Sequence, residues 1–238
     1  MKIHILVTLF SFLIFTTQSN AKVTESSKQN ALTTAKNYIK FAKMAWELET
    51  SFAEESLDQT KKGAYCAMGE ELIDLATMSK NIFGDVYKNT SDQEKHIIEN
   101  ALLDNIAHIF LDKIGDKINF VFDWEKAHVQ ETRIGRGRDR VKGLKVDVKT
   151  WHPKFDIPAS TQPKKTSTLT FEIIPTETEG EYLLVDLVLK GIRVSSLYGE
   201  WVRQIRLEIK TLDEVLSIWE DQNDPNCPSD LEPYRNLF

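Results

Sequence analysis

Alternation of apolar and polar residues between positions 144 and 189 most limits what this chain can fold into. Apolar residues take every second position of two segments, Leu144, Val146 and Val148 in the first and Leu169, Phe171 and Ile173 in the second. A period of two is that of a strand with one buried face. A third segment, Tyr182 to Leu189, is apolar at both parities apart from Asp186, as in a strand buried on both sides or one whose face lines an apolar cavity. The spacing of these segments predicts an antiparallel meander.

Turns and one more strand flank these segments. Ala127 to Ile134 is compatible with a strand, and Gly135-Arg136-Gly137 with a tight turn after it. This glycine pattern lacks the Gly-Lys-Ser/Thr that would complete a phosphate-binding loop. Three prolines between His152 and Thr166 predict a loop. Glu177 to Gly180 is expected to form the next turn, and Gly191 to end the last strand.

The rest of the chain carries helical spacing. Apolar residues recur every three to four positions in three regions: Tyr38, Ile39, Ala42, Ala45 and Trp46; Met68, Leu72, Leu75 and Ala76; and Leu197, Trp201 and Ile205. This is the period of an amphipathic helix. The polar stretch 56–63 predicts a break between the first two helices.

Two capping boxes mark further helix starts. Ser91-Asp92-Gln93-Glu94 opens a long apolar pattern that runs to Ile114, and Gly115 is suited to end it. Thr211-Leu212-Asp213-Glu214 predicts a last helix. The order of helices, then strands, then helices predicts an α+β protein.

The N-terminal segment has the features of an export signal. Lys2 precedes an apolar run from Ile5 to Phe15, and Ser19-Asn20-Ala21 has the small-x-small pattern of a cleavage site. The run is too short to span a membrane as a helix. We expect residues 1–21 to be a signal peptide, and the mature protein to be a soluble one in the bacterial periplasm.

Composition limits the classes of partner. Removal of residues 1–21 takes away one Lys, so the net charge changes from −6 to −7. The remaining chain suits one domain, residues 22–220, followed by a polar tail, 221–238, that we expect to be extended. An acidic chain is a poor binder of nucleic acid and of anionic headgroups as a whole. Any role with lipids therefore rests on a cavity or a local patch.

Two cysteines, Cys66 and Cys227, leave two alternatives open. In an oxidising compartment they could form a disulfide that ties the tail to an early helix, or both could stay free thiols. No Cys-x-x-Cys motif suggests zinc or redox chemistry.

The sequence contains no motif of a hydrolase, zinc protease or phosphate-binding loop, and we expect no cofactor. No two of His96, His108, His128 and His152 have metal-ligand spacing. Asp186 is the one notable acid, because strict alternation places it on the same strand face as Tyr182 and Leu184. It could be a base with a raised pKa, but we favour a structural carboxylate that caps or hydrogen-bonds neighbouring backbone.

Two stretches resemble the MlaC family of periplasmic phospholipid carriers, also called toluene-tolerance auxiliary proteins. The first runs from Ile73-Asp74 through Ile82-Phe83-Gly84 and Tyr87 to Thr90-Ser91-Asp92-Gln93-Glu94. The second runs from Tyr182 to Trp201, with Val185-Asp186 in the strand and Gly191 after it. Lys190 and Arg193 stand where the family has Glu and Ser.

The resemblance implies a fold, a ligand and partners. The fold would be a curved antiparallel sheet, similar to nuclear-transport-factor-like cones, covered by N- and C-terminal helices. The protein would carry phospholipid between an outer-membrane lipoprotein complex and an inner-membrane ABC transporter, with acyl chains between sheet and helices. Eight strand residues are candidates to line the slot: Val146, Val148, Leu169, Phe171, Leu183, Val185, Leu187 and Leu189.

Two other functions remain open at this point. An isomerase-like enzyme could use Asp186 with Tyr182 or His128 in an apolar pocket. An envelope interaction module could have a filled core, carry no ligand, and bind a partner through its acidic surface and tail.

Overall fold

The computed structural model describes residues 23–52, 59–114, 120–135, 140–151, 166–208, 227–228 and 230–235. Its elements in chain order are α1 (Glu25–Phe52), α2 (Gln59–Leu72), α3 (Leu75–Phe83), α4 (Asp85–Asn89), α5 (Asp92–Ile114), β1 (Val121–Ile134), β2 (Val141–Trp151), β3 (Ser167–Pro175), β4 (Tyr182–Leu189), β5 (Ile192–Arg193), α6 (Val194–Glu208) and the 3₁₀-helix η2 (Glu232–Tyr234). The signal peptide, the loop from His152, and the helix expected after Thr211 lie outside the described residues.

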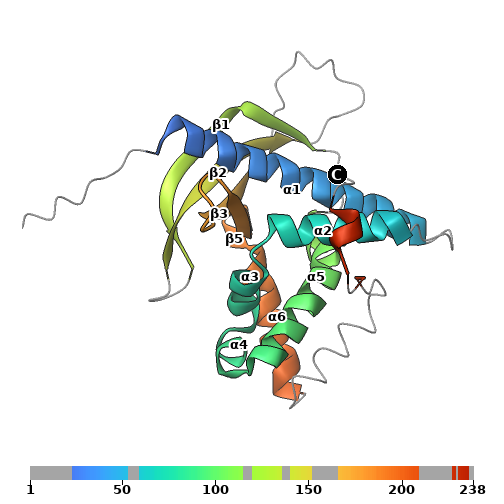
Figure 1. Ribbon diagram of the computed structural model, residues 1–238. Coiled ribbons are helices and arrows are strands. Elements are labelled where there is room, and N and C mark those ends of the chain that lie inside the picture. The colour runs from blue at the N-terminus through green and yellow to red at the C-terminus, as the bar shows by residue number, and fades with distance from the viewer. Residues whose placement is uncertain are drawn as a thin grey trace, which may run out of the picture.

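The strands form one curved sheet in the order β1-β2-β3-β4-β5, with every neighbouring pair antiparallel. This is the predicted meander, and the protein is of the α+β class. The tight turn between β4 and β5 has Lys190 and Gly191 at positive φ of 52° and 83°, which explains why the strand ends there. Figure 1 shows α1 lying across the sheet, with α3, α4, α5 and α6 grouped below it.

Strand β1 begins at Val121, earlier than the expected start at Ala127. The pairing of β1 with β2 shifts register between Asp123 and His128. Such a bulge interrupts the two-residue period. The sequence pattern therefore predicted only the part of the strand that follows the bulge. The missed part carries Phe122 and Trp124, whose side chains are partly buried and pack against the core.

A second register shift corrects the placement of Asp186. Glu172 pairs with Asp186, but the next residue, Ile173, pairs with Leu184. Neighbouring residues on β3 point to opposite faces, so Asp186 and Leu184 also lie on opposite faces. The extra residue in β4 therefore invalidates the prediction that they share one.

The helices differ from the expected ones at their junctions. Met68 to Ala76 was expected to be one helix, but α2 ends at Leu72 and α3 starts at Leu75. Between them Ile73 forms an isolated bridge with Leu184, and the Asp74 carboxylate accepts a 2.8 Å bond from the Thr77 amide. This cap starts a new helix. Residues 59–63, expected in a break, belong to α2.

The capping box at Ser91 is confirmed. The Ser91 amide donates to the Glu94 carboxylate at 2.8 Å, and the Glu94 amide donates to Ser91 Oγ at 3.3 Å.

In α6, Val194 and Val202 are buried, whereas Leu197 is 39% exposed. The described contacts of α6 are with α3, β4, β5 and α5.

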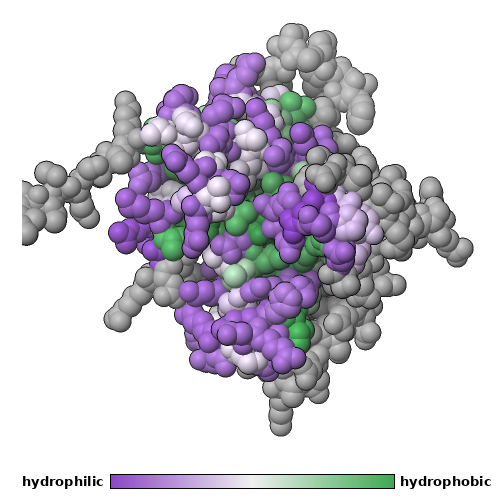
Figure 2. Space-filling model, in the orientation of Figure 1, coloured by the Kyte–Doolittle hydropathy of each residue, from purple (hydrophilic) through white to green (hydrophobic). Residues whose placement is uncertain are grey.

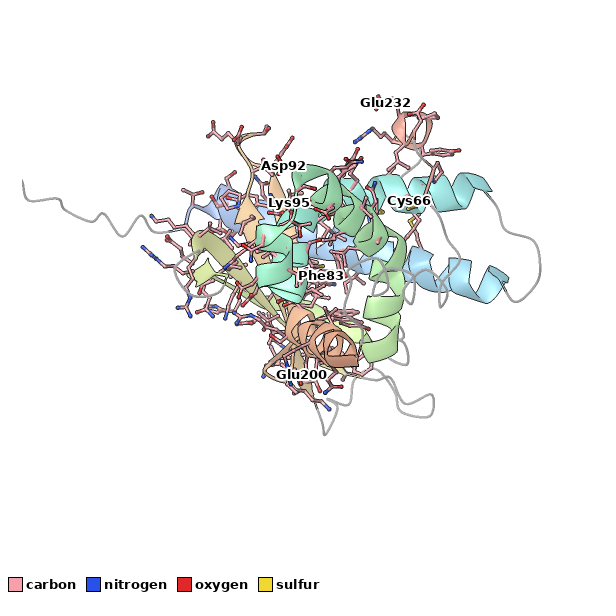
Figure 3. The ribbon with its side chains drawn as sticks, turned by 90° about the horizontal axis from the view of Figure 1, so that it is seen from below. Cys66, Phe83, Asp92, Lys95, Glu200 and Glu232 are labelled. Carbon is pink, nitrogen blue, oxygen red and sulfur yellow. A yellow bond between two sulfur atoms is a disulfide. The ribbon has the colours of Figure 1, made fainter. Side chains whose placement is uncertain are left out.

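The described part of the tail, residues 227–228 and 230–235, is anchored to α2, where an extended segment was expected. Cys66 and Cys227 form a disulfide, with Cα atoms 5.8 Å apart. Arg235, just after η2, pairs with Glu70 at 2.7 Å and Glu71 at 3.0 Å. Figure 3 shows Cys66 on α2 and Glu232 at the 3₁₀-helix beside it. Within the described ranges, no helix has the length and apolarity needed to cross a bilayer.

Candidate functional site

The candidate site lies between the sheet and α1. Three cross-strand rows of β2, β3 and β4 share the sheet face that meets α1: Leu144, Ile173 and Leu184; Val146, Phe171 and Leu187; and Val148, Leu169 and Leu189. All are buried except Leu189, which is half-buried. These rows form a continuous apolar surface.

Six of the eight residues expected to line a slot lie on this surface. The other two, Leu183 and Val185, do not belong to the rows. Leu183 pairs with Ile174 on the opposite face, and Val185 lies in the irregularity of β4. Because the bulge changes parity within β4, alternation along its sequence could not assign these two residues.

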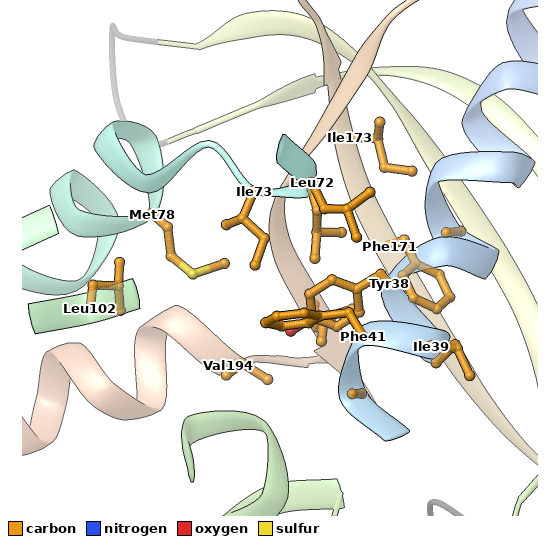
Figure 4. Close-up of a cluster of buried hydrophobic side chains, with 14 of the residues drawn as sticks. Tyr38, Ile39, Phe41, Leu72, Ile73, Met78, Leu102, Phe171, Ile173 and Val194 are labelled. Carbon is orange, nitrogen blue, oxygen red and sulfur yellow. The ribbon is translucent and has the colours of Figure 1, made fainter. Parts of the chain in front are cut away.

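Side chains of α1 fill the space against this surface. The ring of Tyr38 lies 6.4 Å from that of Phe171, centroid to centroid, and Phe41 stacks on Tyr65 of α2 at 4.6 Å. Figure 4 shows Tyr38 beside Phe171, with Phe41 and Ile39 on the same helix. Tyr38, Phe41 and Phe171 are at most 2% exposed. In the part of the chain that the structure describes, the interior is thus packed with protein side chains.

The edge at β1 is more open. Phe122 and Trp124 stack at 5.6 Å, and Trp124 lies 6.1 Å from Phe171, while Lys36 Nζ lies 5.8 Å above the Trp124 ring. Phe122, Trp124, Ala127 and Val129 are only partly buried. These residues, which we call the aromatic rim, connect solvent to the buried rows. Sequence analysis missed Phe122 and Trp124, and their spacing of two residues is the signal that could have found them.

Two shallow pockets flank Tyr182. One, of about 240 Å³, lies between Asn30, Thr34 and the β3–β4 turn, and the other, of about 200 Å³, lies between Val23 and Leu144. Both are smaller than the 300–1,000 Å³ of typical small-molecule sites. The face in Figure 2 is mainly hydrophilic, with hydrophobic residues gathered in a central strip between α1–α2 and α3.

Asp186 lies on the other side of the sheet and caps α6. Its carboxylate accepts from the amides of Leu187 at 2.8 Å and Ser195 at 3.1 Å, and from the Ser195 hydroxyl. Burial raises the pKa of Asp186 from 3.8 to about 6, against the lowering effect of these bonds. The structural role favoured from the sequence is therefore what the contacts show.

Glu172 is next to Asp186 and is also 1% exposed. It receives two bonds from the Arg193 guanidinium, at 2.7 and 3.0 Å, and lies 3.4 Å from Lys145 Nζ. These cations compensate a buried charge that would otherwise be costly.

His128 is exposed, and no group of metal-ligating side chains occurs within the described ranges.

Comparisons with known proteins give limited similarity. No protein-family model matches the chain, and no curated protein is significantly similar to it in sequence. Among solved structures, the chain is similar to the phospholipid-binding protein from Ralstonia solanacearum in complex with a phospholipid. The two share 8% sequence identity, with 77% of this chain and 95% of that chain covered and a TM-score of 0.44. Similarity at this level assigns neither a family nor a ligand to this chain.

Proposed function

We propose that this protein is a periplasmic phospholipid carrier that holds acyl chains against the apolar sheet face under α1. The observation that carries the proposal is the aromatic rim, because it joins three buried apolar rows to solvent at an open sheet edge. The motifs that resemble the MlaC family support the same ligand. Transfer of this kind needs no turnover, so we propose a binding protein and not an enzyme.

Acyl chains would replace protein contacts in this site. Each methylene removed from water contributes about 0.8 kcal/mol. Because α1 fills the site against Phe171 in the described residues, α1 must move away from the sheet to admit a chain. The acyl chain then covers the apolar rows that α1 leaves, so little apolar surface of the sheet becomes exposed to water.

The rim offers a place for the headgroup. Lys36 lies over Trp124 at the solvent end of the site. An ammonium at this position suits a phosphate, while the adjoining rings contact the glycerol and the first methylenes. Delivery to an inner-membrane ABC transporter and exchange with an outer-membrane lipoprotein complex are part of the same proposal.

Native mass spectrometry of the mature protein, purified from a bacterial periplasm without detergent, tests the proposal. We expect about one phospholipid per chain, identified by extraction, and an N-terminus at Lys22. Trp124→Asp places a charge in the rim and should abolish the bound lipid. Val121→Asp is the matched control, because Val121 is already 39% exposed on the same strand, and it should retain the lipid.

A second candidate is a ligand-free envelope interaction module. The observation that favours it is the filled interior between α1 and the sheet in the described residues. An unliganded mass for the wild-type protein, with no uptake from phospholipid vesicles, would reject the carrier and support this module.

A further inference from the structure

The β1–β2 hairpin ends in basic residues on an otherwise acidic protein. Arg133 lies near the end of β1, and Arg140 and Lys142 flank Val141 at the start of β2. We call these four residues the hairpin end. Its three basic residues are exposed, whereas the whole chain has a net charge of −6. A local positive excess on an acidic chain orients it toward an anionic partner.

The sheet register places two of these cations opposite each other. Arg133 is the cross-strand partner of Lys142, and like charges at opposed positions destabilise a strand pair. Lys142 Nζ lies 3.8 Å from Glu131, in a pair whose side chains are 74% and 41% exposed, so this pair contributes little. Within the described ranges, no ion pair engages Arg133 or Arg140. An anion from outside the chain would relieve this repulsion.

An apolar side chain lies between the cations. Val141 is 46% exposed, although its cross-strand partner Ile134 is fully buried. Cations beside an exposed aliphatic group suit a bilayer surface, where the charges meet phosphates and the aliphatic group enters the interfacial layer. An acidic protein surface would use the cations but would leave Val141 without a role.

The next exposed acidic segment is the β3–β4 turn, which lies at the same end of the sheet as the β1–β2 turn. Glu177, Glu179 and Glu181 are exposed in the β3–β4 turn. This turn lies against α1, because a Cβ built on Gly180 would be 3.2 Å from Asn30 Nδ2. In Figure 1 the paired ends of β1 and β2 point down at the lower left, and Lys142 lines a shallow pocket with Ser27 of α1 and Tyr182 of β4.

We propose that the hairpin end docks the protein onto an anionic lipid surface. This inference goes beyond lipid carriage and stands without it, since it concerns contact with the outside of a bilayer. Docking by this surface would bring the protein to a membrane despite its net negative charge.

Flotation of the mature protein with vesicles tests the docking surface. We expect binding to phosphatidylethanolamine–phosphatidylglycerol vesicles, none to phosphatidylcholine vesicles, and weaker binding at high salt. Each basic side chain near such a surface contributes about fivefold in affinity. Arg133→Glu with Arg140→Glu should therefore weaken binding at least about 25-fold. Val141→Ser should weaken it without changing its salt dependence.

Lys126→Glu with Lys149→Glu is the matched control. It makes the same charge change on exposed positions of the same two strands, with Lys149 about 25 Å along β2 from Val141. We expect a change within about twofold. Circular dichroism and the mass of the intact disulfide confirm that both variants fold.

Two results would overturn the docking proposal: no binding of the wild type to anionic vesicles, or an equal loss in the control variant. Bound lipid, measured on the same samples, keeps the two proposals separate. Hairpin variants that lose vesicle binding but retain lipid support docking. Wild-type protein that floats without bound lipid also supports docking, and rejects only the carrier.

Discussion

Removal of the Cys66–Cys227 disulfide should lower the free energy of unfolding by about 5 kcal/mol. The bond joins residues 161 positions apart, and the chain-entropy model gives about 4.7 kcal/mol for a loop of 100 residues, rising slowly with length. Other described contacts of the tail are weaker, because the pairs of Arg235 with Glu70 and Glu71 are solvent-exposed. Since a domain has only about 5–15 kcal/mol in total, the change should bring the protein close to unfolding.

Urea unfolding of the mature protein measures this loss. Cys66→Ala with Cys227→Ala suits the fully buried position of Cys66, because serine would bury a hydroxyl there. Reduced wild-type protein is the matched comparison and should lose the same amount within about 1 kcal/mol. The dependence on urea should also steepen, as the unfolded chain exposes more surface. A loss below about 1 kcal/mol, with the oxidised bond verified by mass, would refute the reasoning.

Three further predictions concern the interior and the tail. Phe171→Ala should lower the free energy of unfolding by about 3–5 kcal/mol, since the ring is fully buried. A decrease below about 1 kcal/mol, measured by urea denaturation, would contradict the close packing of this ring. Gly63→Ala should displace Tyr234, whose ring atoms would lie 2.4 Å from the new Cβ. Faster hydrogen exchange at residues 230–235 checks this, and unchanged exchange would count against it. Burial raises the pKa of Asp186 from 3.8 to about 6, so the folded state holds this proton more tightly and stability falls as pH rises from about 4 to 6. Asp186→Asn should remove that fall, of about 3 kcal/mol, and parallel stability–pH curves for the two proteins would disprove it.

Local sequence patterns were sufficient to predict the elements in which the apolar period is uninterrupted. The apolar rows of β2 and β3 follow directly from alternation, because residues two apart share a strand face whatever the partner strand is. The capping box at Ser91 needs only four consecutive residues. The turn at Gly191 likewise depends on local backbone conformation.

The candidate site was predictable only in part. Six of the eight candidate residues, Phe171 among them, lie on the face toward α1, but alternation alone does not say which face a helix covers. Leu183 lies on the opposite face, and Val185 could not be assigned to a face, because the shift in β4 is visible only in its pairing with β3. Trp124 was missed because a bulge in β1 hides its strand.

The sequence by itself determined the α+β order of elements, most strand positions and the chemistry available to each face. Tertiary structure decided that α1 covers the apolar rows, that Asp186 caps α6, and that Cys66 meets Cys227. The physical reason is the range of the interactions. Periodicity and capping act within a few residues, whereas register shifts, helix docking and disulfide pairing depend on partners far along the chain.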